Sequence, residues 1–295
     1  MSTLLALLVR QQAIVRVELP SGRVDTLTDD AGAAPDGIAV VGDTVYWTTM
    51  GVPELIPGVP GEAGRDYSAS NGGVHAIELD GTGRRDILPD GALTTGKQLV
   101  SDGSRLYWGD REGCLVSCCR LDGTGLTNLV VRERSDDWLN ECVGVAVDPA
   151  AGWLYWTQKG PAKGGVGRIL RAPLALDGDP ATRADIETLW DGLPEPIDLE
   201  LSDGYLYWTD RGAEPDGNTL NRAPVPAPRA AGATPEILAR GFQETIGLAI
   251  DADAGIAYVS DLSGAIRAVP LPGSAGEETV VASLDTPVTG IALVS

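Results

Sequence analysis

Six times along the chain, a short apolar segment leads into a second segment that is rich in aromatic residues. Four of the second segments contain Tyr-Trp, and a fifth reads Ala-Tyr-Val-Ser-Asp. From the first of these tyrosines to the last, the steps are 61, 48, 52 and 51 residues. A repeat of this length, made only of strands and turns, is typical of the blades of a β-propeller. The five segments are Val45–Thr49, Leu106–Asp110, Leu154–Gln158, Leu206–Asp210 and Ala257–Asp261.

Each repeat has the same order of strands and turns. A first strand, which mostly opens with a small residue, is followed by a turn rich in Asp and Gly, such as Ser202–Gly204. Third and fourth strands flank a second turn, as in Ile77–Leu88. Period-two patterning bounded by Gly, Asp and Asn is typical of antiparallel strands. Since 295 residues hold six units of about 49 residues, we expect one all-β domain over residues 1–295, a six-bladed propeller of four-stranded antiparallel blades.

The two ends of the chain complement each other. The last repeat stops after its first strand, Thr289–Ser295, and the N-terminal segment supplies the strands that this repeat lacks. We therefore expect blade six to combine residues 1–30 with residues 286–295, which closes the ring and removes two open sheet edges. Aligning the third strands of blades five and six places Ala6 at the position of Tyr258. The N-terminal strands are Leu4–Val9, Ala13–Leu19 and Arg23–Leu27.

The formal net charge of −20 and the pI near 4.3 argue against nucleic acid and anionic membranes as partners, because both need a basic protein face. The N-terminal segment has a short apolar run without a basic leader or a small-residue cleavage site. No stretch reaches the ~18 apolar residues of a membrane-spanning helix. We therefore expect a soluble, cytoplasmic protein.

The cysteines and the single histidine limit the chemistry that the chain can carry out. Cys114 and Cys118 would lie roughly 13 Å apart on one strand, too far for a disulfide, so we expect buried free thiols at these positions and at Cys119 and Cys142. His75, on a third strand, is expected to be a surface or packing residue. One histidine excludes multi-histidine metal sites and disfavours a Ser-His-Asp triad.

The Leu-Tyr-Trp-Thr-Asp strands, together with the Leu-Asp-Gly-Thr-Gly turn at Leu121–Gly125, resemble the YWTD β-propellers of the low-density-lipoprotein receptor family over essentially the whole chain. This resemblance implies a protein-binding role and a framework role for the last Asp of the motif, at Asp110, Asp210 and Asp261. We interpret the four tryptophans of the motif as framework too. The architecture is also similar to the gluconolactonase/regucalcin and strictosidine-synthase families, whose enzymes have their sites at the mouth of the central channel.

Two first strands depart from the pattern of the other four. At their first aligned position, four repeats carry Gly, whereas the second carries Lys97 and the fourth Asp198. Two positions later, Glu200 replaces a small apolar residue. Asp198 and Glu200 share one strand face, where mutual repulsion and desolvation raise the pKa of at least one carboxyl. We predict that this pair exchanges protons with a substrate and that Lys97 stabilises developing negative charge, unless Glu200 is paired with a cation of a neighbouring blade.

Further acidic residues precede the first strands. Glu141, Glu195 and Glu244 stand three positions before the strand in three consecutive repeats, and Asp36 precedes the first. We expect these side chains, with Gln98, to bind substrate at the channel mouth, unless they are solvated turn residues. No cofactor is required, but Glu141, Asp198 and Glu244 are the ligands that we predict if Ca²⁺ or another divalent cation binds.

Long connections gather on the side where the first strands begin. They are expected to form a lid or a specificity wall, with Tyr67, Arg65 and Trp138 facing the substrate, although Met50–Gly73 could also be a disordered loop. The other connections are Arg132–Cys142, Lys159–Arg168 and Arg211–Thr219.

Two function classes therefore stay open. The favoured one is an enzyme with a small-molecule ligand at an acidic channel mouth, working by acid–base chemistry as a hydrolase, lyase, isomerase or cyclase. The other is a non-catalytic propeller that holds a protein or peptide partner.

Overall fold

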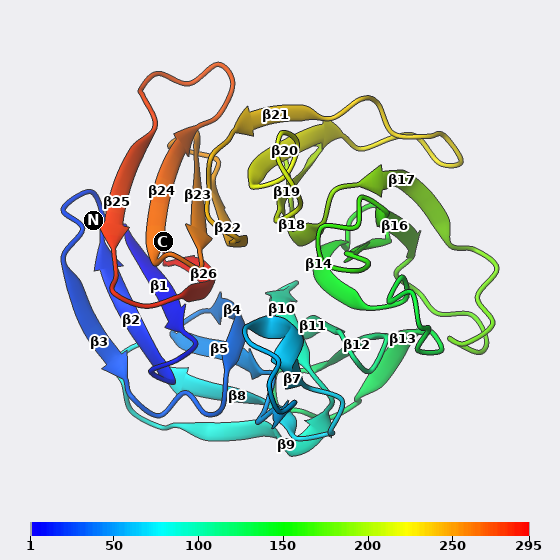
Figure 1. Cartoon of the computed structure of the whole chain (residues 1–295), viewed down its shortest axis with the longest axis horizontal. Coiled ribbons are helices and arrows are strands. Elements are labelled where there is room, and N and C mark those ends of the chain that lie inside the picture. Colours follow the sequence, from blue (N-terminus) through cyan, green and yellow to red (C-terminus); the bar gives the residue numbers. More distant parts are fainter. Residues whose placement is uncertain (1, 295) are drawn as a thin grey trace.

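Six four-stranded antiparallel sheets surround a central axis, and the first strand of each repeat is the innermost (Figure 1). This arrangement was obtained as a computed structural model that describes residues 2–294, with Glu62 described by its backbone alone. The predicted six-bladed, all-β propeller is confirmed. Each blade is an antiparallel meander in which hydrogen-bonded neighbours are consecutive strands of that blade along the chain, except where β26 pairs with β1 in the blade that joins the two ends.

In blades one to five, the strands follow one another along the chain from the inner to the outer edge. Blade one holds β4 (Pro35–Val41), β5 (Thr44–Thr49), β8 (Gly72–Glu78) and β9 (Arg85–Leu93). Blade two holds β10 (Gly96–Ser101), β11 (Arg105–Asp110), β12 (Leu115–Arg120) and β13 (Thr127–Val131). Blade three holds β14 (Cys142–Asp148), β15 (Trp153–Gln158), β16 (Gly167–Pro173) and β17 (Glu187–Leu193). Blade four holds β18 (Pro196–Ser202), β19 (Tyr205–Asp210), β20 (Thr219–Pro224) and β21 (Glu236–Ala239). Blade five holds β22 (Thr245–Asp251), β23 (Ile256–Asp261), β24 (Ala265–Pro270) and β25 (Thr279–Ser283).

Blade six closes the ring as the sequence predicts. Its inner strand is β26 (Val288–Val294), and β1 (Thr3–Leu8), β2 (Ala13–Glu18) and β3 (Val24–Thr28) complete it (Figure 1). The predicted register was wrong by one residue. Leu5 pairs with Ala292 as Tyr258 pairs with Ala249, so Leu5, not Ala6, takes the tyrosine position. The turn between β1 and β2 is one residue longer than the turn between β23 and β24, which shifts the alignment.

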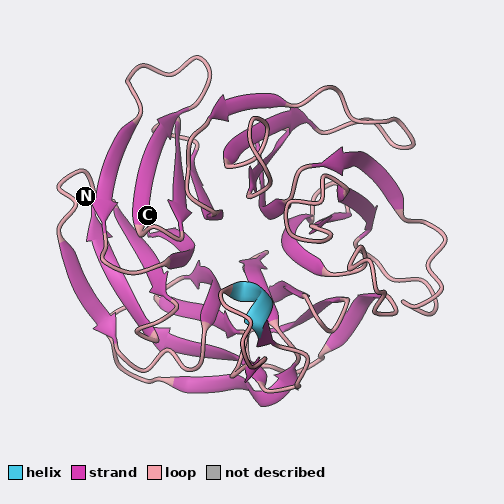
Figure 2. Ribbon diagram, viewed as in Figure 1, coloured by secondary structure: helices cyan, strands magenta, loops and turns pink. Residues whose placement is uncertain are grey.

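The connection from β5 to β8 is ordered. It forms the short hairpin of β6 (Glu54–Leu55) and β7 (Arg65–Asp66), with a single 3-10 turn at Glu62–Gly64 between them. Figure 2 shows this turn as the helical element of the fold, beside the central opening. No helix within residues 2–294 is long and apolar enough to cross a membrane.

Second-strand hydroxyls join neighbouring blades. The Oγ1 atoms of Thr48, Thr157 and Thr209 each accept the N–H at the first aligned position of their own inner strand. Each of these hydroxyls also donates to a carbonyl of the next inner strand, at 2.7 Å. Glycine is needed at that first position where the strands come closest. A Cβ on Gly144 would lie 2.1 Å from the Ile197 carbonyl oxygen.

The remaining motif residues are framework, as predicted. The side chains of Trp47, Trp108, Trp156 and Trp208 are fully buried between blades. The carboxylates of Asp110, Asp210 and Asp261 accept backbone N–H groups of the loop that leads into their own inner strand. These bonds fix the loops at the side where the inner strands begin.

Blade one uses other residues where the motif Asp is missing. Thr49 Oγ1 accepts the Gly73 N–H and lies 3.2 Å from His75 Nε2, and His75 Nδ1 lies 2.8 Å from Asp86 Oδ1. His75 is therefore a buried packing residue on the third strand. The four cysteines are buried and free, as predicted.

Candidate functional site

The central channel holds two cavities, which lie along different halves of the inner strands. One cavity, of about 410 Å³, is lined by the later residues of all six inner strands, and we call it the acid cavity. The other, of about 320 Å³, is lined by residues at the start of the inner strands and by the loops around them, and we call it the mouth cavity. The predicted site residues are divided between the two.

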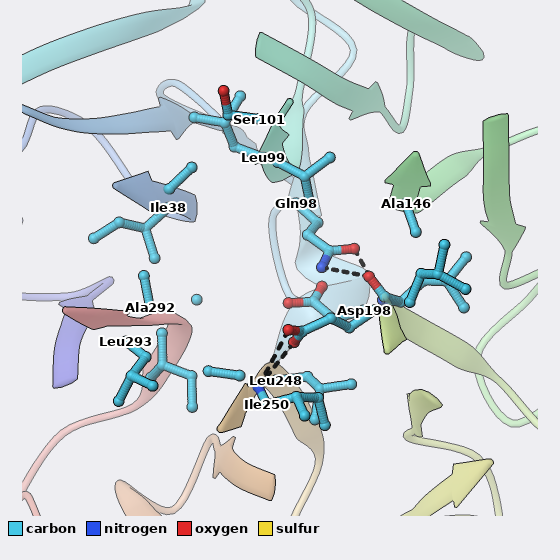
Figure 3. Close-up of a pocket in the computed structure, with 18 of the residues that line it drawn as sticks. Ile38, Gln98, Leu99, Ser101, Ala146, Asp198, Leu248, Ile250, Ala292 and Leu293 are labelled. Atoms are coloured by element: carbon cyan, nitrogen blue, oxygen red, sulfur yellow. Dashed lines mark hydrogen bonds between the residues drawn. The ribbon is translucent and has the colours of Figure 1, made fainter. Parts of the chain in front are cut away.

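Asp198 lines the acid cavity without a hydrogen-bonding partner for its carboxylate. Figure 3 shows the side chain of this residue pointing into the cavity beside Gln98. The residue is only 3% exposed, and its Oδ1 atom is buried with no hydrogen bond. Burial, followed by the negative charge of Asp36, raises the pKa of Asp198 well above its usual value, although Lys97 opposes the shift. The protonated form of Asp198 is therefore favoured relative to that of an exposed aspartate.

Glu200 lies on the same strand face and also lines the acid cavity. The Ile250 N–H of the next blade donates to its two carboxylate oxygens, at 3.2 and 3.1 Å. Burial raises the pKa of Glu200 to about 8, because one hydrogen bond does not compensate for lost hydration. Within residues 2–294, Glu200 forms no ion pair with Arg or Lys, so the cation considered in the sequence analysis is not present there. The raised pKa expected for at least one member of the pair is found for both.

Gln98 has a different role from the predicted one. Its Oε1 atom accepts the N–H group of Val145. The same atom accepts the Leu199 N–H, and Nε2 donates to the Leu199 carbonyl (Figure 3). The amide thus joins the inner strands of blades two, three and four. In blade two, Gly109 stands where the second strands of blades one, three, four and five carry a hydroxyl, and the Gln98 amide provides a link between blades there. Gln98 lines the acid cavity, but its polar atoms are used by the fold.

Lys97 and Asp36 lie in the mouth cavity, apart from the pair of acids. Lys97 Nζ donates to Asp36 Oδ1 at 2.6 Å, and both side chains are buried. The sequence analysis placed Lys97 in one catalytic group with Asp198 and Glu200. The predicted alignment was wrong by one residue in this strand, because Leu99 pairs with Trp108 as Leu199 pairs with Trp208 and Ile38 with Trp47. Lys97 is therefore equivalent to Asp36 and opens to the mouth cavity. The electric fields of Asp36 and Lys97 still act on Asp198.

The three predicted rim glutamates line neither cavity. Glu195 is fully buried and accepts Arg211 Nη2 at 2.7 Å, while Glu141 lies 4.0 Å from Lys159 Nζ. Glu244, which is more exposed, accepts Lys163 Nζ at 2.6 Å. The prediction that the channel mouth is acidic is therefore wrong, because Lys and Arg side chains of the neighbouring loops form ion pairs with these glutamates.

These cations form a column that the sequence analysis missed. The residue that directly follows the aromatic strand is Arg111, Lys159 and Arg211 in three consecutive blades, and the rim glutamates belong to overlapping blades. A comparison of that column across the repeats, like the comparison of the inner strands, would have indicated the ion pairs. Lys159 lies 3.6 Å from Glu195, so each acid stands between two cations.

The loop residues are only partly where they were expected. Tyr67 and Arg65 line the mouth cavity, with the Arg111 guanidinium 5.6 Å from the centre of the Tyr67 ring. Trp138 is 45% exposed and lines neither cavity, which leaves its predicted contact with substrate without support.

No group of three or more His, Cys, Asp or Glu side chains in the described part of the chain is arranged to hold a metal ion. Glu141, Asp198 and Glu244 are separated from one another, and the two glutamates face cations.

No family model matches the chain. Two fungal proteins are similar to it in sequence. A Pyricularia oryzae protein named low-density lipoprotein receptor-related protein 1 is 40% identical over 288 residues, which cover 91% of this chain and 88% of that protein. A Cochliobolus heterostrophus protein named 3-hydroxyacyl-CoA dehydrogenase-like protein LAM1 is 38% identical over 280 residues. That match covers 88% of this chain but only 56% of the longer relative.

Solved structures share the fold at low sequence identity. A chain of a nidogen/laminin complex matches with a TM-score of 0.71 and 18% identity, covering 99% of this chain and 98% of that one. The calcium-binding protein regucalcin of Agrobacterium tumefaciens matches with a TM-score of 0.58 and 16% identity, covering 88% and 77%. The repeats, the closed ring and the relative from Pyricularia oryzae together show that the chain belongs to the family of six-bladed β-propellers related to the YWTD propeller of the low-density-lipoprotein receptor.

Proposed function

We propose that the chain is a small-molecule enzyme whose site is the acid cavity, where Asp198 and Glu200 exchange protons with the substrate. The buried Asp198 carboxylate carries this proposal, because it borders a cavity and its Oδ1 atom has no partner. Leaving a buried polar atom unpaired costs about 1–3 kcal/mol. Unlike the framework residues Trp156 and Asp210, which also have an unpaired buried atom, Asp198 borders a cavity that could hold a ligand. A catalytic group is commonly kept at a cost in stability.

The two carboxyls suit different steps. Asp198, whose pKa is raised by burial, would be the donor to an oxygen or nitrogen of the substrate. Glu200, with a pKa of about 8, can accept and return a proton close to neutral pH, where general catalysis is most effective. Apolar side chains that also line the cavity would contact the substrate's hydrocarbon part; they include Ile38, Leu99, Leu248 and Ile250. Hydrolase, lyase, isomerase and cyclase reactions all use this chemistry.

The fold is compatible with such a role, since regucalcin and lactonase structures share it. Lys97 has no part in the proposed reaction, because it is bound to Asp36 in the mouth cavity.

A melting-temperature screen tests the proposal. Small amines, lactones and esters would be added to the wild type, to Asp198→Asn and to Asp203→Asn, an exposed control at the turn after β18 that also removes one carboxylate. We expect a ligand that raises the Tm of the wild type and of Asp203→Asn but not of Asp198→Asn, and that is then turned over by the wild type alone. Equal stabilisation of all three proteins, or of none by any compound, would contradict the proposal.

A second function is favoured by the surface around the mouth. Several apolar side chains of the β5–β8 connection are exposed, and the relative from Pyricularia oryzae carries a receptor-related name. A docking platform for a protein would use this surface. Leu55→Ser/Ile56→Ser should then abolish stoichiometric capture of one partner, while Leu126→Ser, an exposed apolar control in blade two, should not. The exposed side chains are Val52, Leu55, Ile56 and Val59.

A further inference from the structure

The mouth cavity is a second feature of the channel with the size of a small-molecule site, about 320 Å³. We propose that it binds a small organic anion that also carries a hydroxyl group. This site is separate from the acid cavity and does not depend on the function proposed there. Among the described residues, the charged side chains that line it are Arg10, Arg65, Lys97, Arg111, Arg211 and Asp36.

The buried cations of this cavity are held in place by acids that do not line it. Arg111 Nε donates to both carboxylate oxygens of Glu112, at 2.8 and 2.9 Å. Arg211 donates to Glu195 Oε1 from Nε at 3.1 Å and from Nη2 at 2.7 Å. Because these ion pairs fix the guanidinium groups before a ligand arrives, binding needs little side-chain ordering.

Lys97 and Asp36 provide the polar atoms at the inner end of the site. A lysine ammonium has three donors, and Lys97 Nζ uses one on Asp36 Oδ1 and a second, at 3.4 Å, on the weak acceptor Met50 Sδ. Asp36 is 2% exposed, and its Oδ2 atom is buried without a hydrogen-bond partner. A ligand hydroxyl would satisfy this oxygen, while an anionic group of the same ligand would meet the exposed Arg10 and Arg65 at the rim. The combination points to a hydroxy acid rather than to a plain anion.

The negative charge of the whole chain does not exclude an anion here. At physiological salt, charges separated by more than about 8 Å are largely screened, so the lining of the cavity dominates the local field. Arg10 and Arg65 are exposed at the rim, where they would attract an approaching anion.

Calorimetric titration of the full chain at pH 7 with L-malate, succinate and inorganic phosphate tests the proposal. Malate and succinate differ by one hydroxyl, so they isolate the contribution of Asp36. We expect malate to bind about tenfold more tightly than succinate, a difference of about 1.4 kcal/mol. Arg10→Gln/Arg65→Gln, at two exposed positions that leave the fold intact, should weaken malate binding by at least about tenfold.

Two controls locate the site. Arg229→Gln removes an exposed cation that does not line the cavity and should bind malate as the wild type does. Asp198→Asn should also bind malate normally, because Asp198 lines the other cavity. The proposal is overturned if none of the three anions binds at millimolar concentration, if the double variant binds as the wild type does, or if Asp198→Asn abolishes binding. Equal affinities for malate and succinate would overturn the role of Asp36.

Discussion

The acid cavity and the mouth cavity share four of the inner strands that line them, β4, β10, β22 and β26, yet their charges are arranged in opposite ways. In the mouth cavity, Lys97 is bound to Asp36, and Arg211 is bound to Glu195. In the acid cavity, Asp198 and Glu200 have no cation beside them and share the space with apolar side chains. The buried charged residues that line the mouth are therefore paired with opposite charges, whereas those that line the acid cavity lie among apolar side chains.

Removing one partner of the mouth pair should have the largest effect on stability. Lys97→Met leaves Asp36 buried and unpaired, and the loss of one partner of a buried ion pair costs about 3–5 kcal/mol. Urea denaturation would measure this loss. The double variant Asp36→Asn/Lys97→Met should recover most of it, because it leaves no buried charge behind. A loss below about 1 kcal/mol in the single variant would show that the pair is not structural.

Replacing Gln98 tests whether its side-chain amide stabilises the fold by joining the inner strands of three blades. Gln98→Ala leaves the Val145 and Leu199 N–H groups without their acceptor, at an expected cost of about 2–4 kcal/mol. Ser101→Ala, which lines the same cavity, is the matched control and should cost about 1 kcal/mol. Similar unfolding midpoints for the two variants would argue against the link between blades.

Replacing Asp198, a member of the carboxyl pair, should change stability in the opposite direction. Asp198→Asn should leave stability unchanged or raise it by about 0.5–2 kcal/mol, because no cation or donor is left unpaired. Chemical denaturation at pH 7 would measure the change. A loss of more than about 2 kcal/mol would mean that the carboxylate is ionised and paired, in conflict with the structure.

The pH dependence of stability has a defined direction. The pKa of Glu200 is raised to about 8 from 4.5, so the folded chain keeps a proton between these values that the unfolded chain releases. Its contribution to stability is complete below pH 4.5 and is lost as the pH rises through about 8, with a slope of up to about 1.4 kcal/mol per pH unit. Glu200→Gln should remove this slope. Asp210, whose pKa is raised to about 7, supplies a background that is the same in both proteins.

The smallest effect on stability is expected for an exposed ion pair at the rim of the channel mouth. Lys163 and Glu244 form an ion pair at 2.6 Å, but both side chains are well exposed. Exposed pairs contribute at most about 1 kcal/mol, so Lys163→Ala should change the unfolding midpoint little. A loss as large as that of Lys97→Met would remove the distinction between buried and exposed ion pairs in this mouth.

The fold could be predicted from the sequence because the same pattern of strands and turns recurs in each repeat. The aromatic strands, the Asp- and Gly-rich turns and the broken sixth repeat fix the number of blades and the closure of the ring. Even the special residues Asp198 and Glu200 were found by comparing columns. The register of β1 was missed because an extra turn residue between β1 and β2 does not change the strand pattern.

The site could be predicted only in part. A column of aligned residues shows which positions differ, but it does not show which end of the channel they open to. The sequence alignment put Lys97 and Asp198 in one column, but the pairing of Leu99 with Trp108 and of Leu199 with Trp208 shows that Gln98, not Lys97, is equivalent to Asp198. Lys97 lies one position earlier and lines the other cavity. The partners of Glu141 and Glu195 come from loops that follow the aromatic strands, and the sequence does not show how those loops fold back over the rim.

The protonation of the acid cavity at neutral pH is the central claim, and infrared difference spectroscopy tests it most directly. The C=O band of a protonated carboxyl would be recorded for the wild type and for Asp198→Asn/Glu200→Gln between pH 5 and pH 9. We predict a band in the wild type at pH 6.5 that is absent from the double variant and weakens as the pH passes about 8, the pKa of Glu200. If the wild type and the double variant give the same spectrum at pH 6.5, both acids are ionised and the acid cavity does not hold a proton.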